Sequence, residues 1–427
     1  MIGLVVNPVA GVGGPAGLAG SDGGAVQARA AERGSVPRAH ERAVQALTII
    51  ARSHPGERIL TAAGPMGEAA VAAAGLVPAV VFAPGLPTTA DDTAAAVAAV
   101  AAAGASLVLV VGGDGTLRDA VRGLASCTFS SESLSEAVDS SGSLSEAAEG
   151  DRDETQRPAD DRVSSRSVPE PVEGRSTTGI VVLGIPAGVK MYSPVFAVSP
   201  VAAGSLAVDW LGSDPVPTAE REVLDVDEAA LRRARVEPVL YGTLRVPQRL
   251  GRTQARKAPT PVTEEAAVAS AARGAVGAMR PGVRYLLGPG GTTARIAAEL
   301  GVAKTPLGVD VVLDGAVIAA GADERTLLDQ VAAGPAKAVV TVIGGQGFLL
   351  GRGNQQLSAR VIRALGDDPL LVVAPEQKLV DLGGRPLLVD TGDPALDATL
   401  AGHVRVITGA EATAFYAVAA PEASLSV

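Results

Sequence analysis

Short apolar runs alternate with longer amphipathic stretches along the first 125 residues. The apolar runs have the length and continuity of buried strands, and we place these at residues 2–6, 58–62, 79–83 and 107–111. The stretches between and after them have helical spacing, and we place helices at residues 39–53, 67–74, 92–103 and 117–125. Strands that alternate with helices predict a parallel sheet with helices packed on its faces.

The pattern breaks off at residues 130–178. This segment is rich in Ser, Glu, Asp and Pro, has no aromatic residue, and contains the run SLSEA twice, at 133–137 and 143–147. Such a composition cannot bury enough apolar surface to offset the entropy of ordering the chain. We therefore predict a disordered, acidic, Ser-rich insertion.

Alternation resumes at a buried strand over residues 179–184. We expect a helix over 200–211, short strands and a helix over 221–253, and a helix, strand and helix at 262–279, 283–287 and 292–300. Further strands are expected at 338–343, 370–374 and 404–408. The predicted fold is α/β, with an N-terminal nucleotide-binding domain over residues 1–200 that carries the insertion. A mixed α/β domain over residues 201–427 would complete the active-site cleft.

Composition narrows the class of protein. The chain has 427 residues, 47% of them hydrophobic but only 2% aromatic, so its core must be aliphatic. Few aromatic rings and a net charge of −10 argue against a nucleic-acid binder. The apolar stretch 94–111 is Ala-rich and broken by a turn, which favours a helix followed by a strand over a membrane span. We expect a cytoplasmic protein with small-molecule ligands and no membrane partner; self-association is left open.

The most informative motif is Gly112-Gly113-Asp114-Gly115-Thr116, which follows an apolar strand and precedes a helix. Glycines let backbone N–H groups approach phosphate oxygens, and the N-terminus of the following helix favours an anion. We therefore predict that Gly112, Gly113, Gly115 and Thr116 bind phosphate. A carboxylate beside phosphate is repulsive unless it holds Mg²⁺ or accepts a proton, so Asp114 is the predicted catalytic residue and candidate Mg²⁺ ligand.

Two further loops follow predicted strands in the same half of the chain. The loop after the first strand contains Asn7 and Gly11, and the loop over residues 184–193 contains Gly188 and Lys190. We predict that these four residues contact phosphate, with Lys190 neutralising its charge. The chain contains no Walker A sequence, and the first loop matches a dinucleotide-binding fingerprint poorly because no strand-end acid follows about 20 residues later.

Similar turns occur in the second half, at residues 288–293 and 344–356. The predicted phosphate- or nucleotide-binding residues there, together with an acid downstream of the first turn that could place a carboxylate nearby, are Gly290, Gly291, Thr292, Thr293, Asp310 and Asn354. The carboxyl ends of strands in an open sheet face a common crevice. We therefore expect all five turns to surround one polyphosphate ligand.

These motifs resemble those of a known superfamily. Asn7-Pro8, the turn at residues 112–116 and Leu183-Gly184-Ile185 resemble the superfamily shared by NAD kinases, diacylglycerol-type lipid kinases and phosphofructokinases. With the segments 288–293, 308–310 and 351–356, the chain is most similar to the ATP-NAD kinase-like branch that includes the acetoin-catabolism protein X homologues.

The resemblance implies an activity and its cofactors. Asp114 would act on the 2′-hydroxyl of the adenosine ribose of NAD, with ATP or polyphosphate as the phosphoryl donor and Mg²⁺ as a cofactor. Thr292 and Thr293 would belong to the nucleotide loop.

The sequence leaves two other functions open. One is a kinase for another hydroxyl acceptor such as a lipid. The lipid kinases place Asn-Glu soon after the glycine turn, where this chain has Arg118-Asp119. The other is a nucleotide-binding regulatory protein without turnover, which would not need Asp114. The leading hypothesis is a kinase that makes NADP from NAD.

Overall fold

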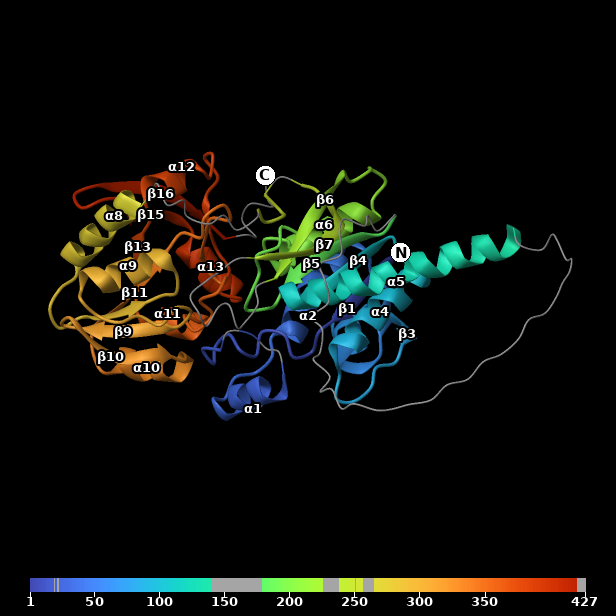
Figure 1. Cartoon of the computed structure of the whole chain (residues 1–427), viewed down its shortest axis with the longest axis horizontal. Coiled ribbons are helices and arrows are strands. Elements are labelled where there is room, and N and C mark those ends of the chain that lie inside the picture. The colour runs from blue at the N-terminus through green and yellow to red at the C-terminus, as the bar shows by residue number, and fades with distance from the viewer. Residues whose placement is uncertain are drawn as a thin grey trace, which may run out of the picture.

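The computed structural model describes residues 1–18, 20, 23–139, 179–225, 238–249, 251–255 and 265–420, with the backbone alone over 127–139. Figure 1 shows two α/β bodies lying side by side, one built from the blue-to-green part of the chain and the other from the yellow-to-red part. Each body has its own sheet. The predicted α/β class and its two-part organisation are confirmed.

The first sheet has seven strands in the order β3-β2-β1-β4-β5-β7-β6. All neighbours are parallel except the antiparallel pair of β6 and β7. The strands are β1 (Ile2–Val6), β2 (Arg58–Ala62), β3 (Val77–Phe82), β4 (Leu107–Gly112), β5 (Val181–Pro186), β6 (Thr218–Asp225) and β7 (Val239–Pro247).

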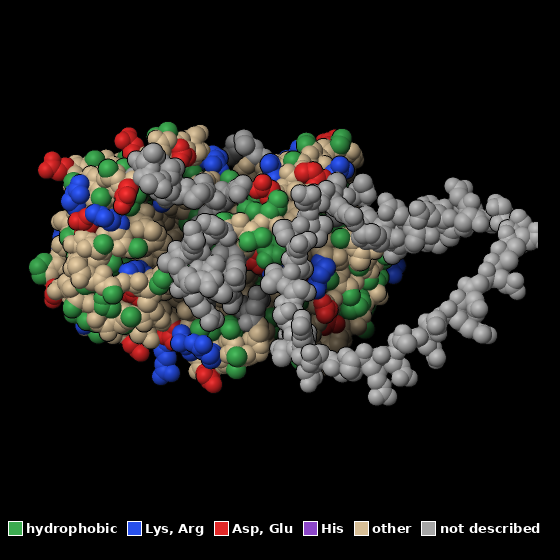
Figure 2. Space-filling view, in the orientation of Figure 1, with side chains coloured by type: hydrophobic (Ala, Val, Ile, Leu, Met, Phe, Trp, Pro, Cys, Tyr) green, Lys and Arg blue, Asp and Glu red, His purple; other side chains and the backbone are tan. Residues whose placement is uncertain are grey.

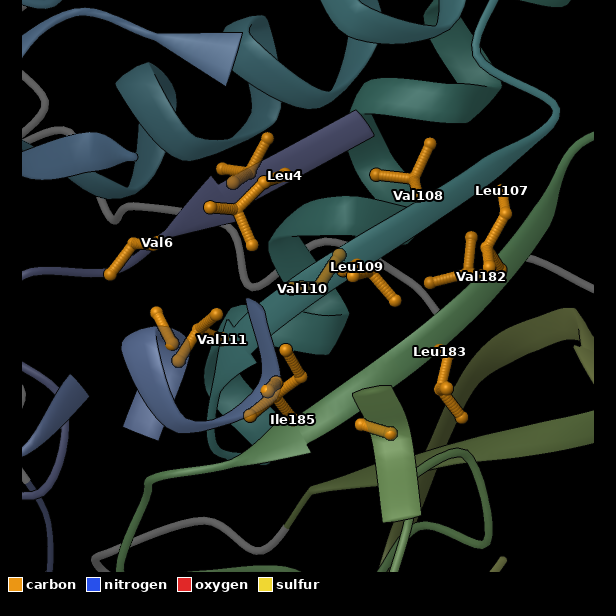
Figure 3. Close-up of a cluster of buried hydrophobic side chains, with 14 of the residues drawn as sticks. Leu4, Val6, Leu107, Val108, Leu109, Val110, Val111, Val182, Leu183 and Ile185 are labelled. Carbon is orange, nitrogen blue, oxygen red and sulfur yellow. The ribbon is translucent and has the colours of Figure 1, made fainter. Parts of the chain in front are cut away.

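The centre of this sheet is buried on both faces. Every residue of β1, β4 and β5 is buried, and their aliphatic side chains form one continuous cluster (Figure 3). A parallel strand covered on both sides by helices needs an uninterrupted apolar run, which is the pattern these strands have. This buried core holds β1, β4 and β5 side by side, and the loops that follow them therefore leave the sheet at neighbouring positions.

Two pairs of helices pack together in the first domain. Its helices are α1 (Gly24–Glu32), α2 (Ala39–Ser53), α3 (Glu68–Ala73), α4 (Ala90–Ala102), α5 (Asp114–Asp139) and α6 (Pro200–Leu211). Helix α2 packs on α6, and α4 packs on α5. The bounds of β2, α2 and α6 agree with the sequence prediction, because local periodicity alone marks these elements.

Two predicted boundaries are corrected by the structure. Helix α5 begins at Asp114 and not at residue 117, because the Gly113 carbonyl already accepts hydrogen bonds from the N–H groups of Thr116 and Leu117. The helix also continues to Asp139, so the first ten residues of the predicted insertion are helical. Residues 140–178 lie outside the described part of the chain.

The second sheet has nine strands in the order β10-β9-β8-β11-β13-β15-β16-β14-β12. Its strands are β8 (Arg284–Leu287), β9 (Val309–Leu313), β10 (Ala316–Ala322), β11 (Ala336–Thr341), β12 (Phe348–Leu350), β13 (Leu370–Val373), β14 (Leu387–Val389), β15 (Gly402–Ile407) and β16 (Thr413–Ala419). The helices are α8 (Glu265–Ala278), α9 (Gly291–Glu299), α10 (Glu324–Ala332), α11 (Ala359–Ala364), α12 (Glu376–Val380) and α13 (Pro394–Leu400). The middle strands β8, β11, β13 and β15 are parallel.

Strand pairing moves the boundary between the domains. We expected the first domain to end at residue 200, but β6 and β7 lie beyond that residue and extend the first sheet through the pairing of β5 with β7. Helix α6 also packs on α2 of the first domain. The chain therefore enters the second sheet only at β8, because the antiparallel hairpin of β6 and β7 completes the edge of the first.

The described helices bear on the question of a membrane span, and the face shown in Figure 2 bears on that of a strongly charged surface. No described helix is long and apolar enough to cross a bilayer. On the face shown in Figure 2, acidic and basic side chains are interspersed, and neither sign covers a whole domain.

A buried ion cluster joins the two domains. Arg42 of α2 donates to both carboxylate oxygens of Asp390, at 2.7 and 3.0 Å, and Arg352 donates to the same carboxylate at 2.6 Å. Burial alone would raise the pKa of Asp390, but the attraction of the two guanidinium groups outweighs it and lowers this pKa to about 2. Arg352 also donates to the Val198 carbonyl of the first domain at 2.9 Å. These bonds set how the domains meet.

Replacing Asp390 should therefore destabilise the whole chain. Asp390→Asn leaves two buried guanidinium groups without a counter-charge, and we expect the free energy of unfolding to fall by about 3–5 kcal/mol. The matched control is Asp368→Asn, because Asp368 pairs with Lys337 at an exposed site and should change stability by less than about 1 kcal/mol. Urea denaturation of both variants checks this, and equal losses would contradict the proposed role of the cluster.

Candidate functional site

Three loops meet at the carboxyl ends of β1, β4 and β5. These strands are neighbours in the sheet, so the loops that follow them emerge side by side. Together they form the strand-end cleft, whose walls include Asn7, Gly11, Gly113, Asp114, Gly115, Thr116, Gly188 and Lys190. The structure thus brings together eight of the residues that the sequence motifs singled out.

Backbone contacts hold two of these loops against each other. The Gly112 carbonyl accepts hydrogen bonds from the N–H groups of Ala187 and Gly188, at 3.0 and 2.9 Å. The Asp114 N–H donates to the Lys190 carbonyl at 3.1 Å. A Cβ on Gly188 would lie 2.3 Å from Cα of Gly113, so only glycine fits at this crossing. The loop after β5 is therefore fastened along the start of α5.

Asn7 fastens the third loop. Its Nδ2 donates to Oγ1 of Thr116 at 3.1 Å, and its Oδ1 accepts from the N–H of Val9 at 3.2 Å. The side chain therefore ties the end of β1 to the first turn of α5. Asn7 and Thr116 shape the cleft through this contact as well as lining it.

Asp114 is a buried carboxylate at the N-terminus of α5. Its Oδ2 accepts from the Tyr192 N–H at 2.6 Å, and its Oδ1 accepts from the N–H and hydroxyl of Ser193 at 3.1 and 2.6 Å. Burial raises the pKa of Asp114 to about 7, although the bonds from Ser193 and Tyr192 act in the opposite direction. The carboxylate therefore changes its charge near neutral pH, as a general base requires.

Sequence reasoning missed Asp225 and Ser193. Asp225 ends β6, lines the strand-end cleft and pairs with Arg118 at 3.1 Å; its charge contributes to the raised pKa of Asp114. The Ser193 hydroxyl lies 2.6 Å from Asp114 and accepts from the Leu224 N–H at 2.9 Å, so it links Asp114 to β6. An acid at a strand end is the one local signal that could have identified Asp225.

The cleft contains two carboxylates that could face a cation. Within the described ranges, no group of three or more His, Cys, Asp or Glu residues could hold a metal by itself. Mg²⁺ is commonly held by one or two carboxylates together with substrate phosphates, and Asp114 and Asp225 line one cleft. The donor set therefore fits a Mg²⁺ that arrives with a nucleotide.

Two residues of the second domain that were predicted to bind phosphate or nucleotide form hydrogen bonds within that domain. Asp310 is buried, and its oxygens accept from the N–H and hydroxyl of Thr305 and from the Gly321 N–H, at 2.6 to 2.7 Å. Asn354 closes its own loop by donating to the Leu349 carbonyl and accepting from the Gly351 N–H. Neither side chain is among the walls of the cleft, because these contacts turn both inward.

The turn at residues 288–293 lies at the end of β8, in the other sheet. Thr293 donates to the Gly290 carbonyl at 2.8 Å, and Oγ1 of Thr292 lies 3.3 Å from Nζ of Lys378. Gly290, Gly291, Thr292 and Thr293 do not line the strand-end cleft. A nucleotide contact by these four residues stays a prediction.

The second domain does reach the site through the loop at residues 344–356. Gln346 donates to the Met191 carbonyl at 3.0 Å, and Gln355 donates to the Gly188 carbonyl at 3.1 Å. Both bonds end on the loop after β5. This loop therefore lies between the two domains and is held from both sides.

The close approach of Gly188 to the Gly113 backbone can be tested by adding a methyl group at residue 188. Gly188→Ala places a methyl group against the Gly113 backbone, and we expect a loss of roughly 1–3 kcal/mol in the free energy of unfolding. Gly277→Ala is the control, because a Cβ there meets nothing within 4 Å and the residue lies inside helix α8. It should be neutral or slightly stabilising. Thermal unfolding of both variants checks the prediction, and equal behaviour would show that the loops can separate freely.

Comparison with known proteins agrees with this architecture. The family model of the ATP-NAD kinase N-terminal domain matches residues 2–128, and that of the ATP-NAD kinase C-terminal domain matches residues 280–418. The first match runs from β1 into α5, and the second contains every strand of the second sheet apart from the last residue of β16. No curated protein and no solved structure gives a significant match. The acetoin-catabolism branch stays a prediction.

Proposed function

Because the chain belongs to the ATP-NAD kinase family, we propose that it transfers the terminal phosphoryl group of ATP or polyphosphate to the 2′-hydroxyl of NAD, giving NADP. The observation that carries the proposal is Asp114, a buried carboxylate with a pKa of about 7 at the wall of a glycine-lined cleft. A group that titrates near neutral pH is well suited to accept a proton from a hydroxyl.

The cleft offers the groups that phosphate binding requires. The N-terminus of α5 opens into it, and the positive end of the helix dipole favours an anion there. The backbone of Gly113, Gly115 and Gly188 lines the walls without side chains in the way. Lys190 lines the same space and supplies a positive charge. We assign the phosphate chain of the donor to this region.

In the proposed reaction, ionised Asp114 takes the proton of the ribose 2′-hydroxyl. The hydroxyl oxygen forms a bond to the terminal phosphorus, and the bond from that phosphorus to its bridging oxygen breaks. ADP, or a shortened polyphosphate, leaves with the bridging oxygen. Asp114 then returns its proton to solvent. The bonds from Tyr192 and Ser193 hold the carboxylate in one orientation during these steps.

We assign the Mg²⁺ that such a reaction uses mainly to Asp225. Asp114 accepts three hydrogen bonds that use both of its oxygens, and Asp225, whose Oδ2 pairs with Arg118, lines the same cleft from β6. When bound, Mg²⁺ neutralises the charge of the phosphates. Asp225 would then share the cation with phosphate oxygens, and Lys190 would contribute the remaining positive charge.

Removing the carboxylate tests the proposal. NADP formation from NAD, ATP and Mg²⁺ should fall by about 100-fold or more in kcat for Asp114→Asn, since general-base catalysis contributes about 10²–10⁴-fold. Asp209→Asn is the control, because Asp209 of α6 pairs with Arg252 and does not line the cleft. Nucleotide-dependent thermal stabilisation of the wild type without any product would instead favour a regulatory protein.

The pH dependence should follow the ionisation of Asp114. Only the carboxylate form accepts a proton, so kcat/KM should fall as the pH falls through about 7. The Ser193 hydroxyl stabilises the charged form; Ser193→Ala should therefore raise this pKa and move the acidic limb upward by about one pH unit.

Ser199→Ala is the matched control for this shift. Its hydroxyl caps helix α6 through the Ala202 N–H, and its loss should cost stability by about 1 kcal/mol while leaving the acidic limb in place. An unchanged limb in Ser193→Ala would rule out Asp114 as the titrating base.

A further inference from the structure

A second hollow, which we call the side hollow, adjoins the strand-end cleft. Val189 and Lys190 line both, so the two spaces lie on either side of the same short segment. The side hollow has about 520 Å³ of empty space, part of it open to solvent. A ligand whose phosphates occupy the cleft can therefore extend a second group into the side hollow.

The walls of the side hollow are mainly apolar and come from both domains. Leu18 and Val189 belong to the first domain, whereas Leu307 and Ile343 belong to the second. Arg352 also reaches the hollow, but its guanidinium is used by Asp390 and by backbone carbonyls. Lys190 lies where the two spaces meet, and the mainly apolar walls beyond it suit an uncharged ring.

One residue of these walls carries a polar atom that lacks a partner. Gln356 is 3% exposed, and its Oε1 is buried without a hydrogen bond to any group in the described part of the chain. Leaving a buried carbonyl oxygen unpaired costs about 1–3 kcal/mol, so few such atoms persist in folded proteins. Among the described residues, Gln355 has the only other unpaired carbonyl oxygen of this kind, and that residue lines a different hollow, on the other side of the loop after β5.

We propose that the side hollow binds an aromatic ring of the nucleotide substrates and that Oε1 of Gln356 accepts a hydrogen bond from an exocyclic N–H on that ring. The assignment rests on the proposed function, since it places the phosphates in the adjoining cleft. The 6-amino group of adenine and the carboxamide of nicotinamide both present such a donor. If the ring carried an oxygen at that position, this oxygen and Oε1 of Gln356 would both be acceptors, and no hydrogen bond could form between them.

Three substrate analogues distinguish whether the ring in the side hollow is the adenine of NAD, the nicotinamide of NAD or the adenine of ATP. Nicotinamide hypoxanthine dinucleotide replaces the adenine amino group of NAD with oxygen, nicotinic acid adenine dinucleotide replaces the carboxamide with carboxylate, and ITP replaces the amino group of ATP. One of the three should lower the wild-type kcat/KM by roughly tenfold to 100-fold, because the Gln356 oxygen then faces an acceptor. That analogue identifies the ring that Gln356 contacts.

Gln356→Met tests whether this residue causes the discrimination. Methionine keeps the length of the side chain and removes its amide, so the ratio of kcat/KM between parent and analogue should approach one. Gln377→Met makes the same change at an exposed position that lines neither space and should keep the wild-type ratio. Discrimination that survives in Gln356→Met, or that disappears in Gln377→Met instead, would overturn the assignment.

The wild-type comparison requires no variant to fold, and equal use of all three analogues would by itself overturn the assignment. Titration calorimetry with the same nucleotides separates this proposal from the proposed function. If NAD and ATP bind without turnover, the kinase proposal fails, while a tenfold or greater difference in Kd between parent and analogue still supports the ring site. If neither parent nucleotide binds the wild type, both proposals fail.

Discussion

The backbone contact between the loop after β4 and the loop after β5 is the constraint on which the rest of the site depends. Gly113 and Gly188 approach too closely for any side chain, and the Gly112 carbonyl holds two N–H groups of the facing loop. The buried strands β4 and β5 deliver these loops side by side, because their paired residues run in register to the last position of each strand. Close packing of the two backbones then shapes the walls of the cleft.

This contact also creates the chemistry of Asp114. The loop after β5 covers the start of α5, removes the carboxylate from water, and presents the N–H groups of Tyr192 and Ser193 to it. Burial and hydrogen bonding act in opposite directions on the pKa, and the net result is a value of about 7. An exposed aspartate at the same helix start would be ionised well below neutral pH, and it would be a weaker base.

The second domain completes the site by resting on the same loop. Gln346 and Gln355 hold the backbone of residues 188–191, while the buried pairing of Arg42, Asp390 and Arg352 sets the position of one domain on the other. The two family models match segments of both domains, and residues of both domains line the side hollow beside this loop. A rotation of the second domain would therefore alter the side hollow before it altered the bonds around Asp114.

The sequence by itself determined the elements with strong local signals. Periodicity marked the bounds of β2, α2 and α6, and the glycine turn at residues 112–116 identified Asp114 and its helix, because these features depend on neighbours along the chain. The predicted role of Asp114 as the reacting base is still a proposal.

Only the tertiary structure decided which distant residues meet. Ser193 bonds to Asp114 and to Leu224 of β6, the pairing of β6 with β7 brings Asp225 to the same place, and Gln356 reaches the side hollow from the second domain. The same long-range packing moved the domain boundary past β7, whereas the hydrogen bonds of Asp310 and Asn354 lie within their own segments and leave their predicted binding role a prediction. Strand order and hydrogen bonds between residues far apart have no local signature, so composition and spacing could not reveal them.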